Sequence, residues 1–324
     1  MTVLVTGAAG FIGYHVARKL AERSERVVGV DSLTDFYGTE LKRRRLVQLS
    51  TFPNFKFHRV DLSDHSALLA ALDGEPVRKV VHLAAQANVR YALENPHAYV
   101  ESNVVGHLNI LEYCRHSGQV ENLIYASSSS VYGARNPIPF REDGETDRPT
   151  SLYAATKKSQ EMMSSVYADI FGIPQIGLRF FSVYGPWGRP DMAYWLFTEA
   201  ILAGKAIRVF NNGEMHRDFT YIDDVVSGVL AVADAPAGLS SDRHRVYNIG
   251  SSRPVSLMDM VAILESLLKK KAMIEMAPMQ AGEMTVTYAD ISAIAEDFGF
   301  RPRTSLEEGL KRFVDWFRRY QQMR

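Results

Sequence analysis

Short runs of β-branched and apolar residues alternate with longer segments of helical periodicity along the first half of this 324-residue chain. The runs predicted to be strands are Val3–Thr6, Arg26–Val30, Lys56–Val60, Lys79–Leu83, Asn122–Ala126 and Gln175–Phe180. The segments predicted to be helices are His15–Glu22, Thr39–Leu49, His65–Leu72, His97–His116 and Leu152–Phe171. Strands and helices in this order form right-handed crossovers on a parallel sheet that is covered on both faces. We therefore predict an α/β fold with a doubly wound parallel sheet.

The alternation stops after Phe181, which indicates a second structural unit. Turn-forming residues and shorter helical segments follow, with a late strand-like run over Val246–Ile249. We expect residues 1–181 to form the sheet domain, with a return segment near 221–260. Residues 182–324 are expected to form most of a smaller C-terminal domain that is interleaved with the first.

The bulk composition excludes several classes of function. The 37 basic and 37 acidic side chains cancel, so no long-range field attracts nucleic acid or an anionic membrane. The single cysteine, Cys114, cannot form an internal disulfide, and the nine histidines form no Cys/His cluster at metal-ligand spacing. The chain runs from Met1 directly into a strand, without a signal peptide or an apolar stretch of membrane-spanning length. We expect a cytoplasmic protein without a structural metal, starting at Met1.

The strand Val3–Thr6 leads directly into the spacing Gly-x-x-Gly-x-x-Gly, formed by Gly7, Gly10 and Gly13. Glycines at a strand-to-helix turn allow the backbone to approach a pyrophosphate and point a helix N-terminus at its charge. The next strand ends at Asp31, where a carboxylate can accept hydrogen bonds from the ribose hydroxyls and repel a 2′-phosphate. A glycine-rich turn without a ligand is the alternative. The combination favours a Rossmann domain that binds NAD.

Other residues at the carboxyl ends of the strands are expected to line the same cofactor site. They are Phe11, Ile12, Asp61, Leu62, Leu83, Ala84, Ala85 and Gln86. Asp61 and Leu62 follow the third strand, on the adenine side. The alternative role for Asp61 is to cap the following helix, which Ser63 or Asp64 could also do.

Tyr153 and Lys157 lie four residues apart at the start of a predicted helix, so their side chains share one face. The strand ending at Ala126 delivers Ser127–Ser130 to the carboxyl end of the sheet, where open α/β sheets bind ligands. On spacing alone, Tyr153 could equally be packed beside a solvated Lys157, and most of the serines could cap backbone groups. The hydroxyls nevertheless lie where chemistry on a ligand would take place.

Together these motifs resemble the extended short-chain dehydrogenase family of nucleotide-sugar epimerases. The resemblance rests on the glycine motif, Leu83–Gln86, the serine run with Val131-Tyr132-Gly133, and Tyr153-x-x-x-Lys157. The blocks similar to UDP-glucuronate 4-epimerases in particular are Arg90–Pro96, Ser151–Lys158, Arg179–Met192 and Arg217–Asp224. The match covers nearly the whole chain.

The resemblance implies NAD-dependent inversion at carbon 4 of a UDP-sugar through a 4-keto intermediate. Tyr153 would be the base, Lys157 and the positive nicotinamide would stabilise its phenolate, and Ser128 would hydrogen-bond the sugar oxygen. Tyr153 and Lys157 would also contact NAD. Hydride returns to the opposite face of the sugar, so the cofactor ends unchanged and is expected to stay bound.

The resemblance also implies which residues hold UDP-glucuronate. Arg217 matches an arginine that pairs with the diphosphate, with an ion pair to Asp218 as the alternative. Arg90 is also assigned to the substrate. The residues expected at the uracil and its ribose are Val209, Phe210 and Glu283. Packing in the core is the alternative for the first two.

The sugar carboxylate is expected to meet a small set of local donors. They are Arg189, Ser182, Ser129 and Ser130. Two departures from the family pattern concern the fit around the sugar and the ribose. Asn88 stands where close relatives have glycine, and Gln280–Glu283 replaces a Pro-Gly-Asp turn.

Neighbouring activities on the same scaffold differ at two positions. A 4,6-dehydratase needs an Asp-Glu pair where this chain has Ser129 and Ser130, and a UDP-glucuronate decarboxylase usually carries a glutamate there. A UDP-glucose or UDP-N-acetylhexosamine 4-epimerase remains the alternative, because it would share Ser128, Tyr153 and Lys157. A non-catalytic NAD-binding regulator fits the glycine loop alone. Conversion of UDP-glucuronate to UDP-galacturonate is the preferred prediction.

The helices His97–His116 and Leu152–Phe171 are expected to pair with their copies across a two-fold axis, as in the family. The residues predicted on the pairing face of the first helix are Val100, Val104, Leu108 and Leu111. The alternative is that these residues face their own sheet. We expect a homodimer.

Overall fold

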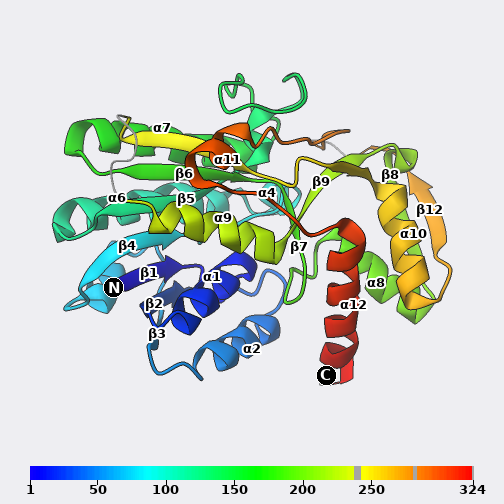
Figure 1. Ribbon diagram of the computed structural model, residues 1–324, viewed down its shortest axis with the longest axis horizontal. Coiled ribbons are helices and arrows are strands. Elements are labelled where there is room, and N and C mark those ends of the chain that lie inside the picture. Colours follow the sequence, from blue (N-terminus) through cyan, green and yellow to red (C-terminus); the bar gives the residue numbers. More distant parts are fainter. Residues whose placement is uncertain (237–241, 280–282, 323–324) are drawn as a thin grey trace.

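A seven-stranded parallel sheet forms the centre of the protein (Figure 1). The computed structural model describes residues 1–236, 242–279 and 283–322. The strands are β1 (Thr2–Thr6), β2 (Arg26–Asp31), β3 (Phe55–Arg59), β4 (Val77–His82), β5 (Asn122–Ser128), β6 (Gln175–Phe180) and β10 (His244–Ile249). Their order is β10-β6-β5-β4-β1-β2-β3. The predicted α/β fold with a doubly wound parallel sheet is confirmed.

Helices cover both faces of this sheet, which explains why its strands are apolar on both sides. The helices are α1 (Phe11–Glu22), α2 (Glu40–Leu49), α3 (His65–Leu72), α6 (Gly106–Ser117), α7 (Leu152–Phe171) and α9 (Ile222–Asp234). Along β1, Val3 and Val5 belong to the core shared with α1, α2 and α9, whereas Leu4 between them belongs to the core shared with α3 and α6. This alternation places Val3, Leu4 and Val5 in cores on opposite faces of the sheet.

The C-terminal part builds two small sheets and four helices, most of them gathered at one end of the molecule (Figure 1). The strands are β7 (Ser182–Tyr184), β8 (Ala206–Phe210), β9 (His216–Tyr221), β11 (Pro254–Ser256) and β12 (Met273–Ala277). The helices are α8 (Ala193–Ala203), α10 (Leu257–Leu268), α11 (Ser292–Phe298) and α12 (Leu306–Gln322). Between these elements the chain returns to the large sheet, where β10 pairs with β6. The late strand predicted over Val246–Ile249 is part of β10.

Three helices differ from their predicted bounds, and for α2 the difference is one residue, because Thr39 is its N-cap and the helix begins at Glu40. Helix α1 begins at Phe11 rather than at His15, because it starts directly after the glycine turn with Gly10 as its N-cap. The predicted helix His97–His116 is divided into α5 (Pro96–Tyr99), a π-helical turn η1 (Val100–Val105) and α6. One extra residue in a turn barely changes the apolar periodicity, so the sequence pattern does not reveal the turn.

Helix α7 has the bounds that the sequence predicts. The Ser151 side chain caps its N-terminus by accepting a hydrogen bond from the Ala154 amide, at 3.1 Å, and Gly172 ends it in the left-handed conformation. These local signals fix the first turn of the helix, which carries Tyr153.

The predicted pairing face is wrong at Leu111. This side chain is completely buried in the protein's own core against the sheet, whereas Val100 and Leu108 are exposed. Among the described residues, no helix is both long and apolar enough to cross a membrane. Within the same ranges, no group of His, Cys, Asp or Glu side chains is arranged to hold a metal ion.

Candidate active site

The turn between β1 and α1 is a cradle that only glycine can form. Gly7 has a φ of +69°, and a Cβ there would lie 2.8 Å from the Ala84 backbone nitrogen. A Cβ on Gly13 would lie 2.1 Å from the Gly7 carbonyl oxygen. Gly10, the N-cap of α1, provides no side-chain cap for the helix amides. This bare helix N-terminus at the carboxyl edge of the sheet fits a pyrophosphate.

Asp31 ends β2 beside this cradle. Its carboxylate accepts hydrogen bonds from the backbone amides of Leu33, at 2.8 Å, and Ala9, at 3.2 Å. The Lys42 ammonium lies 3.6 Å from Asp31 Oδ1, and both side chains are buried. The carboxylate is therefore fixed where it can accept from the ribose of a bound dinucleotide. Sequence reasoning missed Lys42, because nothing local distinguishes it from the other basic residues of α2.

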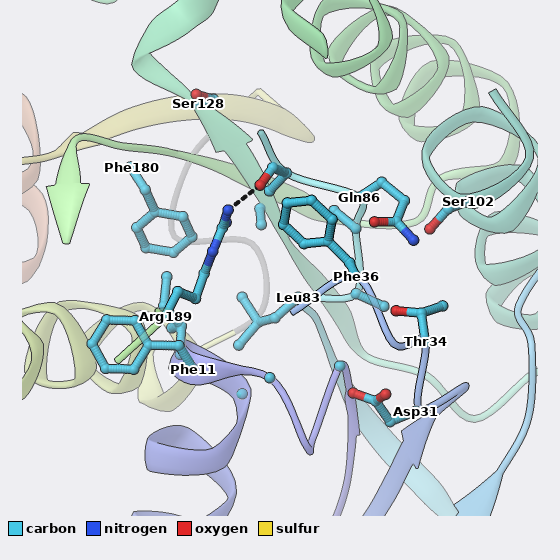
Figure 2. A pocket seen from close by; sticks show the side chains of 18 of the residues that line it. Phe11, Asp31, Thr34, Phe36, Leu83, Gln86, Ser102, Ser128, Phe180 and Arg189 are labelled. Carbon is cyan, nitrogen blue, oxygen red and sulfur yellow. Dashed lines mark hydrogen bonds between the residues drawn. The ribbon is translucent and has the colours of Figure 1, made fainter. Parts of the chain in front are cut away.

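One pocket joins the cradle to the ends of β4 and β5. It contains every residue that the sequence assigns to the cofactor, together with Ser128 and Arg189. The cofactor residues are Gly7, Gly10, Phe11, Ile12, Gly13, Asp31, Asp61, Leu62, Leu83, Ala84, Ala85, Gln86, Tyr153 and Lys157. Figure 2 shows Asp31 and Ser128 at opposite ends of the pocket, with Leu83 between them. Lining residues that sequence reasoning missed include Thr34, Phe36, Tyr37 and Ser102.

Asp61 does not cap helix α3, so the alternative role considered for it is wrong. The cap is Asp64, whose Oδ1 accepts from the Ala67 amide at 2.9 Å. Asp61 instead accepts from the Ser63 amide and hydroxyl at 2.9 and 2.8 Å.

Tyr153 and Lys157 both face the pocket from the first turns of α7. The Lys157 ammonium donates to the Ala126 carbonyl at 2.8 Å and to Gln160 Oε1 at 3.0 Å. Burial lowers the pKa of Lys157 to about 7, although the Glu161 carboxylate opposes the shift. Burial also raises the pKa of Tyr153, while the Ser128 hydroxyl and the Arg189 charge act in the opposite direction. A buried phenol with a lysine one turn away is an arrangement that can support proton transfer.

The serine run divides between the pocket and the backbone. Ser128 ends β5 in the pocket, and its Oγ accepts from the Ser130 amide at 3.2 Å and the Ser130 hydroxyl at 3.0 Å. Ser127 donates to the buried Glu161 carboxylate at 2.6 Å. Ser129 and Ser130 begin a short 3-10 turn, η2 (Ser129–Tyr132), and Ser182 begins β7. Neither Ser129, Ser130 nor Ser182 is among the described lining residues of the pocket.

Arg189 lines the pocket, and its guanidinium is already paired with a carboxylate of the protein. Its Nε and Nη2 donate to Asp191 Oδ1 and Oδ2 at 3.0 and 2.6 Å. Nη2 also donates to the Ala87 carbonyl, the bond drawn at Arg189 in Figure 2. Asn88, the departure noted in the sequence, donates through Nδ2 to Asp191 Oδ2 at 2.8 Å. Burial alone would raise the pKa of Asp191, but Arg189 and Asn88 hold that pKa below its usual value. The arginine thus has a fixed side chain and a carboxylate partner.

A second cluster lies outside the pocket. Arg217 donates to Glu283 Oε2 at 3.0 Å, and Arg90 lies 3.6 Å from the other oxygen of the same carboxylate. Arg90 also lies 5.1 Å from the centre of the Phe210 ring. The alternative pairing of Arg217 with Asp218 is therefore wrong. The Asp218 carboxylate is instead used by backbone amides of other segments.

Burial limits how Val209 could contact a ligand, and one segment that departs from the family pattern lies largely outside the described residues. The Val209 side chain is completely buried in the core, so only its backbone could reach a ligand. Gln280, Ala281 and Gly282 lie outside the described residues.

Asn103 and Gln160 are two buried residues beside the site that sequence reasoning missed. Asn103 Nδ2 donates to the Gln86 carbonyl at 3.0 Å, and its Oδ1 accepts from the Gln86 amide at 2.8 Å. The available signal was a polar residue on a helix face that is otherwise apolar, which does not by itself identify a partner.

Comparison with known proteins gives one consistent answer. The model of the NAD dependent epimerase/dehydratase family matches residues 3–250. Protein CapI of Staphylococcus aureus is 46% identical over 99% of both chains. UDP-glucuronate 4-epimerase 2 of Arabidopsis thaliana is 47% identical over 99% of this chain and 76% of its own. The crystal structure of UDP-glucuronic acid 4-epimerase from Bacillus cereus, in complex with UDP-glucuronic acid and NAD, is 34% identical with a TM-score of 0.91, covering 99% of this chain and 100% of that one.

These comparisons confirm the resemblance to the extended short-chain dehydrogenases and the prediction of an NAD-dependent enzyme. The glycine cradle and Asp31, which line the same pocket, are the features through which this chain fits that cofactor. The chain belongs to the NAD dependent epimerase/dehydratase family.

Proposed function

We propose that this protein is a UDP-glucuronate 4-epimerase that converts UDP-glucuronate to UDP-galacturonate with NAD as its resident cofactor. The observation that carries the proposal is the meeting of Ser128, Tyr153 and Lys157 in the pocket that also contains the glycine cradle. A binding module has no use for these three side chains. The names of the relatives, at 45–47% identity for the plant enzymes of this activity numbered 1 to 4, support the same substrate.

The first half of the reaction needs a base for the 4-hydroxyl proton of the sugar and a hydrogen-bond partner for the 4-oxygen. When bound, NAD accepts a hydride from this carbon and later returns it. Tyr153 removes the proton of the 4-hydroxyl, and the Lys157 ammonium stabilises the phenolate electrostatically. The Ser128 hydroxyl hydrogen-bonds the same sugar oxygen and so orients it. The 4-keto sugar is the product of this half-reaction.

The second half-reaction reuses the same groups. The keto sugar turns over within the site, so that the opposite face of carbon 4 receives the hydride. Tyr153 returns its proton to the 4-oxygen and is regenerated as the base. No proton, hydride or cofactor is consumed over the cycle.

The two arginine-containing clusters are assigned to the remaining parts of the substrate. Arg217 and Arg90 supply positive charge for the diphosphate, and Phe210 and Glu283 lie beside them for the uridine. Val209 would contribute through its backbone. Arg189 with Ser182, Ser129 and Ser130 is assigned to the sugar carboxylate, because a guanidinium recognises this group at two points.

We propose a division into domains that matches this arrangement. Residues 1–181, with the return segment near 221–260, form the NAD-binding part, and residues 182–324 form most of the UDP-sugar-binding part. We also propose a cytoplasmic location, in agreement with the unpaired, buried Cys114.

The enzyme is proposed to work as a homodimer that pairs through η1, α6 and α7. These elements contact one another and carry a set of exposed apolar side chains. The set is Val100, Val105, Leu108, Met162, Val166 and Ile170. Leu111 is not part of this face, because it packs inside the protein.

A UDP-hexose 4-epimerase is the second candidate, and one observation favours it. Arg189 is partly neutralised by Asp191, which lowers its attraction for a sugar carboxylate. Incubation of the purified protein with UDP-glucuronate and with UDP-glucose in parallel, followed by chromatographic separation of the products, decides between the two. Formation of UDP-galacturonate supports the proposal, and formation of UDP-galactose alone would overturn it.

A further inference from the structure

The Lys157 ammonium has two fixed acceptors in the protein. The Ala126 carbonyl and Gln160 Oε1 lie 2.8 and 3.0 Å from its nitrogen, and the side chain is only 1% exposed. An ammonium group carries three N–H donors. Two of them are therefore directed into the protein, and the third remains for the pocket that Lys157 lines with Tyr153.

The orientation of the Gln160 amide is determined from its other end. Its Nε2 donates to the backbone carbonyl of Asn103 at 2.7 Å, and the side chain is completely buried. A carbonyl oxygen can only accept, so the amide nitrogen must face Asn103 and the amide oxygen must face Lys157. Gln160 therefore presents the negative end of its dipole to the ammonium.

Asn103 connects this pair to the cofactor loop. It lies in the π-helical turn η1, and its side chain bonds both the amide and the carbonyl of Gln86 as well as Thr156 Oγ1. Gln86 lines the pocket at the end of β4. Single π-helical turns of this kind occur frequently at functional sites. A continuous path of hydrogen bonds thus joins Gln86, Asn103, Gln160 and Lys157.

We propose that Gln160 is a positioning residue for the epimerase reaction, which holds Lys157 as an ammonium and directs its remaining N–H toward Tyr153. Gln160 acts through Lys157 and touches neither substrate nor cofactor. This inference rests on the proposed function, because it assigns Lys157 the role of stabilising the Tyr153 phenolate.

The other charged and titratable groups around Lys157 do not supply the same contact. Glu161, which follows Gln160 on α7, favours the charged form of Lys157 through its charge, but its carboxylate is bonded to Arg179 at 2.8 Å and to Ser127 at 2.6 Å. Burial lowers the pKa of His82 on β4 to about 3 and the pKa of His107 on α6 well below its usual value. Both rings are therefore neutral at pH 7, so neither acts on the Lys157 ammonium through a net charge. The side-chain acceptor bonded to the Lys157 ammonium is therefore Gln160 Oε1.

The direct test is the titration of Lys157 in the NAD-free protein. Protein labelled with [ε-13C]lysine is followed by NMR against pH, and the Lys157 signal is assigned by its absence in Lys157→Met. Gln160→Met removes the acceptor at nearly constant volume, and we expect a Lys157 titration midpoint about one pH unit lower. Gln160→Glu places a carboxylate at the same point, and we expect a higher midpoint. A matched control is Gln175→Met, the same change at another buried glutamine, on β6.

The kinetic arm separates positioning from folding. For Gln160→Met, we expect kcat for UDP-glucuronate to fall roughly tenfold and its alkaline limb to move to lower pH, with KM changed less than about twofold. Gln175→Met should leave the pH profile unchanged. An unchanged Lys157 midpoint in Gln160→Met, or a shift in the same direction in both Gln160 variants, overturns the inference. If the wild type does not turn over UDP-glucuronate, the proposed function fails, while the NMR titration still decides whether Gln160 controls Lys157.

Discussion

The Lys42 ammonium lies 3.6 Å from the Asp31 carboxylate, and the two side chains are 8% and 6% exposed. Lys42 also donates to Thr34 Oγ1 at 3.0 Å. The acid that would exclude a 2′-phosphate from the adenosine ribose therefore has a buried cation directly beside it. The expected preference for NAD over NADP therefore rests on the Asp31 carboxylate, with Lys42 as the nearby group that could favour a 2′-phosphate.

We predict that Asp31→Ala weakens NAD binding and relaxes discrimination against NADP. The ribose acceptor and the repulsive charge are lost together, while Lys42 remains to attract a 2′-phosphate. Dissociation constants for both cofactors, measured by fluorescence titration, test this. The double variant with Lys42→Ala should lose the gained NADP affinity. Purification of the wild type with NADP bound would contradict the assignment of Asp31.

Tyr153→Phe is predicted to abolish turnover while NAD remains bound. The change removes the group that transfers the proton and leaves the glycine cradle intact. Activity on UDP-glucuronate and the cofactor content of the purified variant are measured together. Turnover above a tenth of the wild-type rate would remove Tyr153 from the mechanism.

Two glycines with the same positive φ should respond differently to substitution by alanine. Gly7 and Gly74 both have a φ of +69°, but a Cβ on Gly7 meets Ala84 at 2.8 Å, whereas one on Gly74 meets nothing within 4 Å. Both variants carry the cost of a left-handed alanine, about 1–2 kcal/mol. We predict that only Gly7→Ala also loses NAD, as measured by the cofactor content after gel filtration. Equal retention of NAD in the two variants would argue against the cradle.

The exposed apolar face of α6 and α7 is predicted to form the dimer. Leu108→Lys combined with Val166→Lys places two charges on that face, and burial of an unpaired charge is strongly unfavourable. Light scattering should give twice the chain mass for the wild type and a mass near 36.4 kDa for the variant. Val47→Lys, at an exposed apolar position on α2, serves as the control. A monomeric wild type at micromolar concentration would disprove the dimer.

The features that could be predicted from the sequence are those with local geometry. Gly7, Gly10 and Gly13 mark a turn that continues directly into α1, and the spacing of Tyr153 and Lys157 needs only one helical turn. Ser151 and Gly172 then fix where that helix begins and ends. Each of these signals is complete within a short stretch of chain, so the fold and the centre of the pocket follow from it.

The features that could not be predicted depend on contacts between distant segments. Gln160 bonds a carbonyl 57 residues away, and Asn88 bonds Asp191 across 103 residues. No periodicity or motif links such pairs. The π-helical turn that carries Asn103 is also invisible in the sequence, because the helix continues on both sides of it. Burial and pairing decide the roles of these residues, and both are properties of the folded chain.

The remaining prediction concerns the charge of the sugar. Arg189 is the basic residue assigned to the carboxylate of UDP-glucuronate, and its Nε and Nη2 are already bonded to Asp191 and Ala87. A sugar carboxylate must therefore share the guanidinium with Asp191, whose second oxygen is also held by Asn88. A neutral hydroxymethyl group in the same place gains no ionic partner, a difference of roughly 1–3 kcal/mol.

We accordingly predict that UDP-glucuronate exceeds UDP-glucose in kcat/KM by about tenfold or more, and that Arg189→Ala removes most of this advantage without loss of NAD. Asp191→Asn gives the opposite test, because it keeps a side chain of the same shape and removes the competing charge. If Arg189 binds the sugar carboxylate, this variant should increase the preference for UDP-glucuronate. If the preference is unchanged in both variants, the epimerase activity still stands, but the role of Arg189 is only structural. It would then hold its loop through its bonds to Ala87 and Asp191. Equal kcat/KM of the wild type for the two sugars would instead favour the UDP-hexose epimerase. The sugar carboxylate would then make no contribution to catalytic efficiency.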